Sequence, residues 1–411
     1  MTTSRISGFH NLNRMDRLAQ IAELAGLIPE DHQHLEQTAS YEGDLADNLS
    51  ENVIGVMSVP LGVATNLIVD GEDVLVPMAT EESSVIAAVC NGAKACRATG
   101  GVSTEADDPC MIAQIQIRDV PDIPSAIQTL KSRQTKIKTL CDEADPMLVE
   151  LGGGFQDLEL RHVDPFLIIH LIVDVRDAMG ANAVNTMAET LAPKIEDWTG
   201  GTVGLKILSN LADRRLIRAN ATWAASEIGS DVVDGIINAY AFAAADPYRA
   251  ATHNKGIMNG VSAVGLATGN DTRALEAGAH AYAAKDGYGP LTRYTKTKDG
   301  NLEGTLEMPM PVGIIGGATR AHPTAQIALK IMKADTAARL GAVIAATGLI
   351  QNFSALRALA TEGIQRGHMG LHARNVAIAA GATGEDIDRI SAQMIAEGTI
   401  RTDVAKKLLD M

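Results

Sequence analysis

Apolar and polar positions change their spacing along the chain, and these changes predict where helices and strands lie. Residues 80–99 are rich in alanine and begin with the cluster Thr-Glu-Glu-Ser-Ser, so we predict a long, tightly packed helix with polar side chains at its N-terminal end. Residues 114–118 alternate between polar and apolar, as a half-buried strand does. Pro124 then opens a helical pattern, so a new structural unit begins near residue 110.

The elements predicted in this unit follow the order β-α-β-β-α-β. Two further strands are expected near 156–163 and 166–175, then a helix over about 177–198 and a strand at 202–209. This is the order of the split βαβ, or ferredoxin-like, arrangement, in which two helices cover one face of a four-stranded sheet. We therefore predict that residues 109–212 form an inserted domain.

The two flanks of this insertion, residues 1–108 and 213–360, are expected to pair as one larger, helix-rich domain of an α+β fold. Closely spaced glycines (Gly363, Gly367, Gly370) then precede short helical patterns near 384–397 and 402–410. Such glycines before a small helical segment suit a hinge, so residues 361–411 are predicted to form a C-terminal flap. The alternative is a merely loose C-terminus.

Charge and composition narrow the class of protein. The 411 residues suit two or three domains, and 35 Lys and Arg against 50 Asp and Glu give a net charge of −15, which argues against a general nucleic-acid surface. The longest strongly apolar run, 166–175, is far shorter than the roughly 20 residues that span a bilayer, and no signal peptide is evident. Four cysteines lack paired metal-ligand spacing. We expect a cytoplasmic protein with free thiols and no membrane segment.

A conventional Rossmann nucleotide site is not supported. No G-x-G-x-x-G motif follows a predicted strand, because Gly152-Gly153-Gly154 is followed by Asp157 where the third glycine would lie. The better candidate is residues 177–182, where an apolar strand runs into a helix whose small first residues let a pyrophosphate approach free backbone N–H groups. The alternative is that Asp177 is a plain N-cap and Gly180 a packing residue.

Four further polar residues are ambiguous on their own. Lys255 lies in the polar, glycine-bounded stretch 246–260, but a lysine there is more often a solvated side chain. Asp271 is similarly more often a turn residue. His368 and His372 are one helical turn apart, which is compatible with metal ligation, but neither H-E-x-x-H nor neighbouring cysteines accompany them, so we predict no metal site.

Seven segments occur in the order seen in 3-hydroxy-3-methylglutaryl-CoA (HMG-CoA) reductases, and together they are far more specific than any one. They are Glu-Asn-Val-Ile-Gly (51–55), Pro-Met-Ala-Thr-Glu-Glu (77–82), Asp-Ala-Met-Gly-Ala-Asn (177–182), Asn-Lys-Gly (254–256), Gly-Asn-Asp (269–271), Gly-Ile-Ile-Gly-Gly-Ala-Thr (313–319) and Gly-His-Met (367–369). The resemblance covers nearly the whole chain. The lack of membrane spans and the form of residues 177–182 resemble the soluble, bacterial-type class II enzymes.

The resemblance implies a reaction and four catalytic residues. Enzymes of this family interconvert HMG-CoA with mevalonate and coenzyme A by two hydride transfers, through a hemithioacetal and mevaldehyde, in isoprenoid metabolism. Glu82, rather than Glu81, matches the catalytic glutamate, and Lys255, Asp271 and His368 match the catalytic lysine, aspartate and histidine. Lys255 would stabilise the oxyanion, and His368 on the flap would protonate the departing CoA thiolate. Glu82, kept protonated by burial and by other carboxylates, would donate a proton to the aldehyde, with Asp271 tuning the Lys255 and Glu82 pair.

The same resemblance implies ligand contacts. The hydroxymethylglutaryl positions are Glu51, Ser84, Arg249, Thr252 and Asn259, and the planar fork of Arg249 suits the terminal carboxylate. The dinucleotide positions are Asp145, Asp177, Met179, Gly180, Ala181, Asn182 and Asn210. Asp145 falls where NAD-preferring members carry an aspartate, which accepts bonds from the ribose 2′-OH and repels a 2′-phosphate, so NAD(H) is expected over NADP(H).

One departure concerns coenzyme A: after Phe9 a basic residue is expected for its phosphates, but His10 is only weakly cationic near neutral pH. Family members are homodimers, often assembled further.

Two other interpretations stay open. An NAD(P)-dependent dehydrogenase of another acyl-CoA would alter the acyl pocket, and the retained Ser84 and Arg249 count against it. A noncatalytic relative would have lost at least one of the four catalytic residues, and none is lost.

Overall fold

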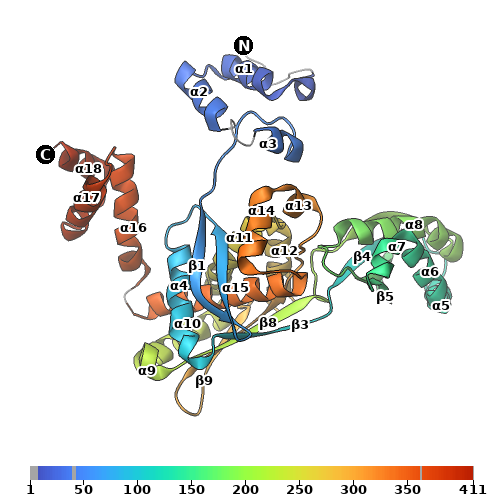
Figure 1. The fold of residues 1–411 in the computed structure, drawn as a ribbon. Helices are drawn as coiled ribbons and strands as arrows, with labels where there is room; N and C mark the ends of the chain where they lie inside the picture. The colour runs from blue at the N-terminus through green and yellow to red at the C-terminus, as the bar shows by residue number, and fades with distance from the viewer. Residues whose placement is uncertain (1–7, 39–42, 362, 411) are drawn as a thin grey trace. The chain divides into compact units, whose positions relative to one another are not determined.

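The computed structural model describes residues 8–38, 43–361 and 363–410, with the side chains of 43, 44 and 364–371 excepted (Figure 1). The chain divides into two compact units, Met1–Pro60 and Leu61–Met411. The first unit is helical. Its elements are η1 (Phe9–Asn11), α1 (Arg14–Ala25), α2 (Pro29–Thr38) and α3 (Gly43–Leu49).

A buried arginine organises the first unit. Arg17 is 6% exposed, and its Nη1 donates to Asp47 Oδ1 at 2.5 Å and to the carbonyl of Val53 at 3.2 Å. The α1 helix that carries it starts where Asn13 accepts a hydrogen bond from the Asp16 amide, and it ends at Gly26 in the left-handed conformation. Arg17 thereby fastens α1 to α3 and to the segment that follows α3.

A six-stranded sheet forms the centre of the second unit, in the order β2-β1-β3-β8-β10-β9. Its strands are β1 (Leu61–Val69), β2 (Glu72–Ala79), β3 (Val102–Ala106), β8 (Leu216–Trp223), β9 (Thr292–Lys296) and β10 (Leu302–Pro309). The β3 and β8 strands pair antiparallel, with Val102 opposite Ala221. Strands from before and after residues 109–212 therefore share one sheet.

Helices with many small residues pack on this sheet or on its neighbouring helices. They are α4 (Val85–Cys96) with η2 (Arg97–Thr99), α9 (Ala225–Ile228), α10 (Ser230–Ala245), α11 (Pro247–Ala267), α12 (Thr272–Ala283), α13 (Gly317–Ala321), α14 (Pro323–Met332) and α15 (Ala337–Ala360). The α11 and α15 helices approach closely, since a Cβ on Gly260 would lie 3.1 Å from the Thr347 carbonyl and one on Gly348 would lie 2.8 Å from Val261. The predicted helix at 80–99 is confirmed as α4 and η2, with the polar cluster just before Val85.

The α15 helix is the one described helix that is long and apolar enough to cross a bilayer by length and composition. Of its apolar window, 72% is buried inside the protein, against the sheet and against α11. That burial is typical of the core helix of a globular fold, because such a helix is apolar on all sides.

A second, four-stranded sheet has the order β5-β6-β4-β7, with every pair antiparallel. Its strands are β4 (Cys110–Arg118), β5 (Gly154–Val163), β6 (Phe166–Asp174) and β7 (Thr202–Leu208), and its helices are α5 (Ile123–Ser132), α6 (Gln134–Ala144), α7 (Pro146–Glu150) and α8 (Ala181–Thr199). Alternate residues of β4, from Met111 to Ile117, are fully buried under α5, α6 and α8.

The alternation predicted at 114–118 is thus confirmed. One helix was expected between β4 and β5, but the structure has three, α5, α6 and α7. Pro146 disfavours a helical conformation at Asp145, whose φ of −142° ends α6.

The last helices, α16 (Ile364–Ala379), α17 (Glu385–Ala396) and α18 (Thr402–Leu409), share a small hydrophobic core of their own. The patterns predicted at 384–397 and 402–410 are confirmed as α17 and α18. The glycine hinge was placed too broadly. Gly367 and Gly370 lie within α16, because Ala373 and Ala377 pack in this core and favour helix through the segment. Only Gly363, with a φ of 78°, precedes it.

Candidate active site

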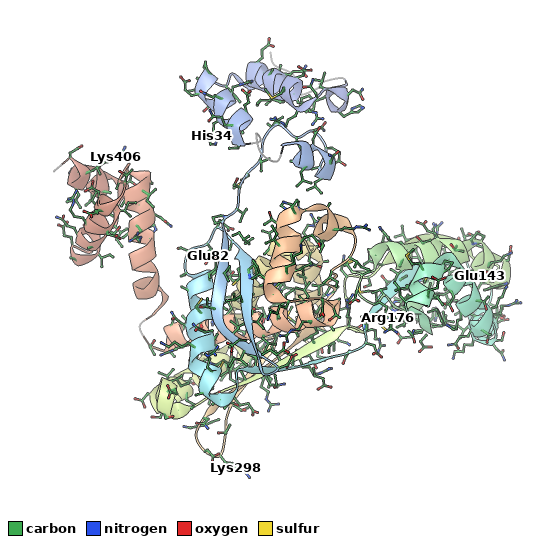
Figure 2. The ribbon with its side chains drawn as sticks, viewed as in Figure 1. His34, Glu82, Glu143, Arg176, Lys298 and Lys406 are labelled. Carbon is green, nitrogen blue, oxygen red and sulfur yellow. The ribbon has the colours of Figure 1, made fainter. Side chains whose placement is uncertain are left out.

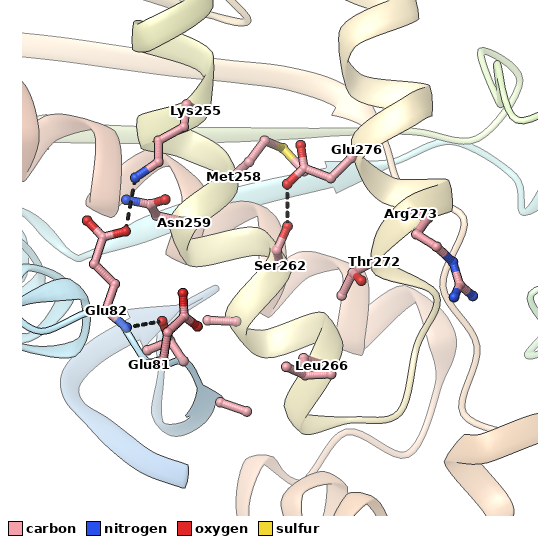
Figure 3. A pocket seen from close by; sticks show the side chains of 13 residues that line it. Glu81, Glu82, Lys255, Met258, Asn259, Ser262, Leu266, Thr272, Arg273 and Glu276 are labelled. Atoms are coloured by element: carbon pink, nitrogen blue, oxygen red, sulfur yellow. Dashed lines mark hydrogen bonds and ion pairs between the residues drawn. The ribbon is translucent and has the colours of Figure 1, made fainter. Parts of the chain in front are cut away.

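Glu82 and Lys255 come together in the second unit. Glu82 follows β2 on the short segment that leads into α4 (Figure 2), and its amide donates to Thr80 Oγ1 at 3.1 Å. The Nζ of Lys255 lies 3.0 Å from Glu82 Oε2. Figure 3 shows the two side chains pointing toward one another across the gap between their elements. Lys255 and Glu82, which the family resemblance predicted as a pair, therefore lie in contact.

Lys255 is presented by the middle of α11. That helix starts sharply because the Asp246 side chain accepts from the Tyr248 amide and Pro247 occupies the first turn. Asn259, four residues after Lys255, lies on the same helical face. Both residues, together with Glu82, line a pocket of about 510 Å³. The full lining is Ala79, Thr80, Glu81, Glu82, Lys255, Met258, Asn259, Ser262, Ala263, Leu266, Thr272, Arg273 and Glu276.

Part of this lining was not anticipated. Ser262 donates to Glu276 at 2.7 Å further along the pocket (Figure 3), and Arg273 contributes a second cation. Ser262 lies seven residues after Lys255, so helical spacing could have indicated it once α11 was recognised as a helix. Glu276 and Arg273 lie on α12, and no spacing within the sequence connects them to Lys255.

The exposure of Glu82 differs from the expectation. Its side chain is 41% exposed and that of Lys255 is 59% exposed, so the burial expected around Glu82 is not found. The pocket is broad, and its rim is formed by helix ends and by the segment after β2. Glu82 is thus positioned by its hydrogen bonds and its ion pair rather than by packing.

Asp271 is placed beside the pocket rather than on the ion pair. It caps α12, accepting from the amides of Arg273 at 2.9 Å and Ala274 at 3.1 Å, and it also pairs with the Arg273 side chain. Burial alone would raise the pKa of Asp271, but these hydrogen bonds hold it below its usual value. The hydrogen bonds of Asp271 are made with these α12 residues. None of them is made with Lys255 or Glu82, although contact with that pair was expected.

The remaining acyl-site residues lie nearby along the chain but are not part of the pocket lining. Ser84 occupies the N-cap of α4 in a left-handed conformation with a φ of 73°, a conformation uncommon outside glycine. Arg249 and Thr252 lie on the first turns of α11, where burial lowers the pKa of Arg249. Glu51 belongs to the first unit, in the turn after α3. His368 lies in α16, but its side chain is outside what the structure describes.

A buried polar network lies on the core side of α11, opposite Lys255. The Nε2 of His253 lies 2.5 Å from Thr292 Oγ1, and Asn352 of α15 accepts from Thr292 and donates to the His253 carbonyl. His253 is 1% exposed, and burial, aided by the charge of Arg249, lowers its pKa to about 4. The network fixes the helix that carries Lys255.

The segment predicted to bind a nucleotide runs from β6 into α8, the strand-to-helix order that the sequence predicts. Gly180 caps α8 with a φ of 99°, and a Cβ there would lie 2.6 Å from Val175 Cγ1, so only glycine fits. No acidic residue occupies the first turn of α8, where Ala181 and Asn182 lie, and the first amides of a helix attract anions. Met179 lies directly before this cap.

The carboxylates predicted to contact the nucleotide already cap helices. Asp177 Oδ1 accepts from the Ala337 amide at 2.7 Å, so it helps Thr336 to cap α15 and does not cap α8. Asp145 Oδ1 accepts from the Leu148 amide at 3.0 Å and caps α7. Asn210 is exposed after β7, and His10 lies in η1 of the first unit. Within the described residues, no group of three His, Cys, Asp or Glu side chains is arranged to hold a metal ion.

Comparison with known proteins identifies the family. The family model for hydroxymethylglutaryl-coenzyme A reductase matches residues 13–373. The chain belongs to this family. A 3-hydroxy-3-methylglutaryl-coenzyme A reductase of Archaeoglobus fulgidus is 54% identical over 413 residues, which are 99% of this chain and 94% of that protein. A probable reductase of Borreliella burgdorferi is 36% identical, over 81% of this chain and 78% of its own length.

The solved structures assign the form of HMG-CoA reductase. A class II enzyme of Streptococcus pneumoniae, bound to NADPH in open conformations, matches with a TM-score of 0.77 at 36% identity, over 97% of this chain and 99% of its own. The chain is a class II, bacterial-type HMG-CoA reductase with a mixed α and β fold. Two of the reductase motifs, 77–82 and 254–256, contribute to the pocket, and 269–271 leads directly into Thr272 and Arg273, which line it.

Proposed function

We propose that this reductase interconverts HMG-CoA with mevalonate and coenzyme A through a hemithioacetal and mevaldehyde, using NAD(H). The observation that carries the proposal is the 3.0 Å contact between Lys255 Nζ and Glu82 Oε2 at a pocket of about 510 Å³. A cation and a carboxylate at one point supply a donor for negative charge on oxygen and a group that can pass a proton. Reduction of a thioester carbonyl to an alcohol needs both.

Lys255 binds the carbonyl oxygen in this mechanism. Its ammonium has three donors, and the one directed at Glu82 leaves others for the substrate. The dinucleotide, when bound, supplies or accepts the hydride. As the thioester carbon becomes tetrahedral, its oxygen gains negative charge, and the interaction with Lys255 strengthens. Lys255 therefore stabilises the oxyanion more than the starting thioester.

Proton transfers fall to the other residues that match the family. His368 protonates the sulfur of the departing coenzyme A. Glu82, whose exposed carboxylate first takes up a proton from solvent, donates the proton that completes the aldehyde reduction. Asp271 tunes the Lys255 and Glu82 pair from the start of α12. Its position directly before pocket-lining Thr272 supports this role, as does the depressed pKa that keeps it ionised.

The acyl group is held from the first turns of α11 in this proposal. Arg249 lies six residues before Lys255, and its forked donors suit the terminal carboxylate of the hydroxymethylglutaryl group. Thr252 and Asn259 share the α11 face of Lys255, and Ser84 and Glu51 match the other acyl-binding positions of the family. The pocket of about 510 Å³ that Asn259 helps to line leaves room for the acyl chain to enter.

The dinucleotide binds at the start of α8. Its pyrophosphate meets the free amides that follow Gly180, with Asp177, Met179, Ala181, Asn182 and Asn210 around it. Asp145 uses Oδ1 to cap α7, and its negative charge favours a ribose 2′-OH over a 2′-phosphate, which is the basis for NAD(H). A pneumococcal relative is bound to NADPH, so the assay below compares the two dinucleotides directly.

The domains have separate tasks in this account. Residues 109–212 form the ferredoxin-like, dinucleotide-binding insertion, which its own hydrophobic core supports. Residues 1–108 and 213–360 bind substrate and coenzyme A and make the subunit contacts. Residues 361–411, with their separate core, act as the flap. We place the enzyme in the cytoplasm as a homodimer or a higher assembly of dimers.

Spectrophotometric assay tests the proposal in both directions. Purified protein is supplied with HMG-CoA and NADH in one assay and with mevalonate, coenzyme A and NAD in another. In parallel assays, NADPH replaces NADH and NADP replaces NAD. The proposal expects turnover in both directions with a higher kcat/KM for NADH. Turnover with NADPH alone would refute the cofactor assignment. No turnover with either dinucleotide would refute the reaction.

A further inference from the structure

A buried guanidinium lies between the two segments that frame the proposed dinucleotide site. Arg215, just before β8, is 5% exposed. Its Nη1 donates to the carbonyl of Ala178 at 3.0 Å, and its Nη2 donates to the carbonyl of Val312 at 2.7 Å. Ala178 belongs to the segment that leads into α8, and Val312 begins the loop before α13. One side chain therefore joins two segments that are far apart in sequence.

The same two segments also meet through their backbones. The Ile314 amide donates to the Asp177 carbonyl at 3.0 Å, and Ala178 and Ile315 form a parallel bridge. A Cβ on Gly313 would lie 2.5 Å from the Met179 amide nitrogen, closer than any side chain can approach backbone. Glycine is thus required at 313 for this contact.

The junction continues to the proposed catalytic aspartate. The Gly313 amide donates to Asn270 Oδ1 at 2.8 Å, and Asn270 directly precedes Asp271. A Cβ on Gly269 would lie 2.9 Å from the Thr319 amide nitrogen, so the 269–271 turn also packs against the loop. Arg215, Gly313 and Asn270 form a continuous connection from the start of α8 to the start of α12.

We infer that Arg215 is a positioning residue that sets the dinucleotide-binding end of α8 relative to Asp271. The inference rests on the proposed function, because it takes the start of α8 as the dinucleotide site. The planar fork of arginine reaches two carbonyls on different segments, whereas the single ammonium of lysine reaches one. Burial lowers the pKa of Arg215 to about 10, so the group remains cationic at neutral pH and keeps all its donors.

Steady-state kinetics of Arg215→Lys test the inference. The KM for the dinucleotide is expected to rise about tenfold to a hundredfold, the effect of losing one hydrogen bond to a charged group. The KM for HMG-CoA is expected to stay within about twofold, since Lys255 and Glu82 do not contact the junction. Arg214→Lys is the matched control, because Arg214 is 49% exposed and pairs with Glu159 at the surface.

A second variant covers the case in which Arg215→Lys does not fold. Gly313→Ala introduces the Cβ that meets Met179, and it should raise the same KM. Gly289→Ala is its control, because the nearest atom to a Cβ there is 3.9 Å away. Dinucleotide binding is also titrated directly by nucleotide fluorescence, and melting temperatures are recorded for all variants.

The outcomes separate the inference from the proposed function. A wild-type protein that binds NADH but does not turn over HMG-CoA would refute the proposed reaction, and weaker NADH binding by Arg215→Lys would still support the inference. A wild-type KM for the dinucleotide in both folded variants would overturn the inference. An equal rise of both KM values with a lowered melting temperature would also overturn it, because that result describes a general loss of structure.

Discussion

The ammonium of Lys255 lies 3.0 Å from a carboxylate oxygen of Glu82, across 173 residues of sequence. Both side chains are substantially exposed, at 59% and 41%, and exposed ion pairs typically contribute only about 0–1 kcal/mol to stability. The fold therefore gains little from the pair, although α4, α11 and β2 hold it in place. A contact that the fold does not need for stability is expected to serve the chemistry of the pocket.

Replacement of Lys255 by alanine should remove activity without unfolding the protein. We expect kcat to fall by about a hundredfold to a thousandfold, the cost of losing one donor to an oxyanion. The melting temperature should stay close to that of the wild type because the ion pair is exposed. Lys296→Ala, which removes a surface lysine paired with Asp234, is the control. A Lys255→Ala enzyme with near wild-type kcat would exclude Lys255 from the mechanism.

Glu82→Gln separates the proposed proton donor from its neighbour. The amide keeps the shape of the carboxyl group but cannot release a proton, so reduction of mevaldehyde should be impaired by about a hundredfold or more. Glu81→Gln, one residue earlier, should cause a smaller loss, since Lys255 pairs with Glu82. The rates are measured with free mevaldehyde and the dinucleotide. Equal losses in the two variants would contradict the assignment of Glu82 as the proton donor.

His253 should make the protein less stable in mild acid. Its pKa in the folded protein is about 4, because of burial first and of Arg249 second. An unfolded histidine has a pKa of about 6.5, so the unfolded chain takes up the proton first as the pH falls. The contribution is present above about pH 6.5 and is lost as the pH falls toward 4, by roughly 3 kcal/mol at most.

Urea unfolding across this range measures the effect. His253→Asn, which keeps a polar group near Thr292 but does not titrate, should show a shallower decrease in stability than the wild type. The difference between the two proteins isolates His253 from the other groups that titrate in acid. Parallel curves for wild type and variant would contradict the assignment.

Asp145→Asn should change the preference between dinucleotides. The amide oxygen can still accept from the Leu148 amide and cap α7, so the melting temperature should hold, while the negative charge is removed. The ratio of kcat/KM for NADPH to that for NADH is expected to rise about tenfold, corresponding to about 1.4 kcal/mol. An unchanged ratio would mean that Asp145 is only a helix cap.

Local pattern predicted the local elements well. The alternation in β4, the apolar β6 and the helices at 384–397 and 402–410 all follow from side-chain periodicity. The α11 helix was not predicted from periodicity, because it contains several residues of weak helix propensity: His253, Asn254, Gly256 and Gly260. Its helical conformation is set by close packing on α15, which small residues permit and which no local pattern shows.

The site itself depended on contacts between distant residues. Asp177 has the pattern of a cap for α8, yet it helps to cap α15, whose first amide lies 160 residues away. Arg215 looks like an ordinary surface arginine beside Arg214 in sequence, but it is buried between two carbonyls. Glu82 and Lys255 were linked by their place in the reductase motifs, since spacing within the chain does not connect them.

The stoichiometry of dinucleotide oxidation tests the central claim most directly. Wild-type protein is incubated with limiting HMG-CoA and excess NADH, and the mevalonate and NAD formed are quantified. Two hydride transfers at one pocket predict two NAD per mevalonate, with the same ratio at every stage of the reaction because mevaldehyde stays bound. More than two NAD per mevalonate, with free mevaldehyde accumulating, or the absence of any HMG-CoA-dependent NADH oxidation would contradict the account.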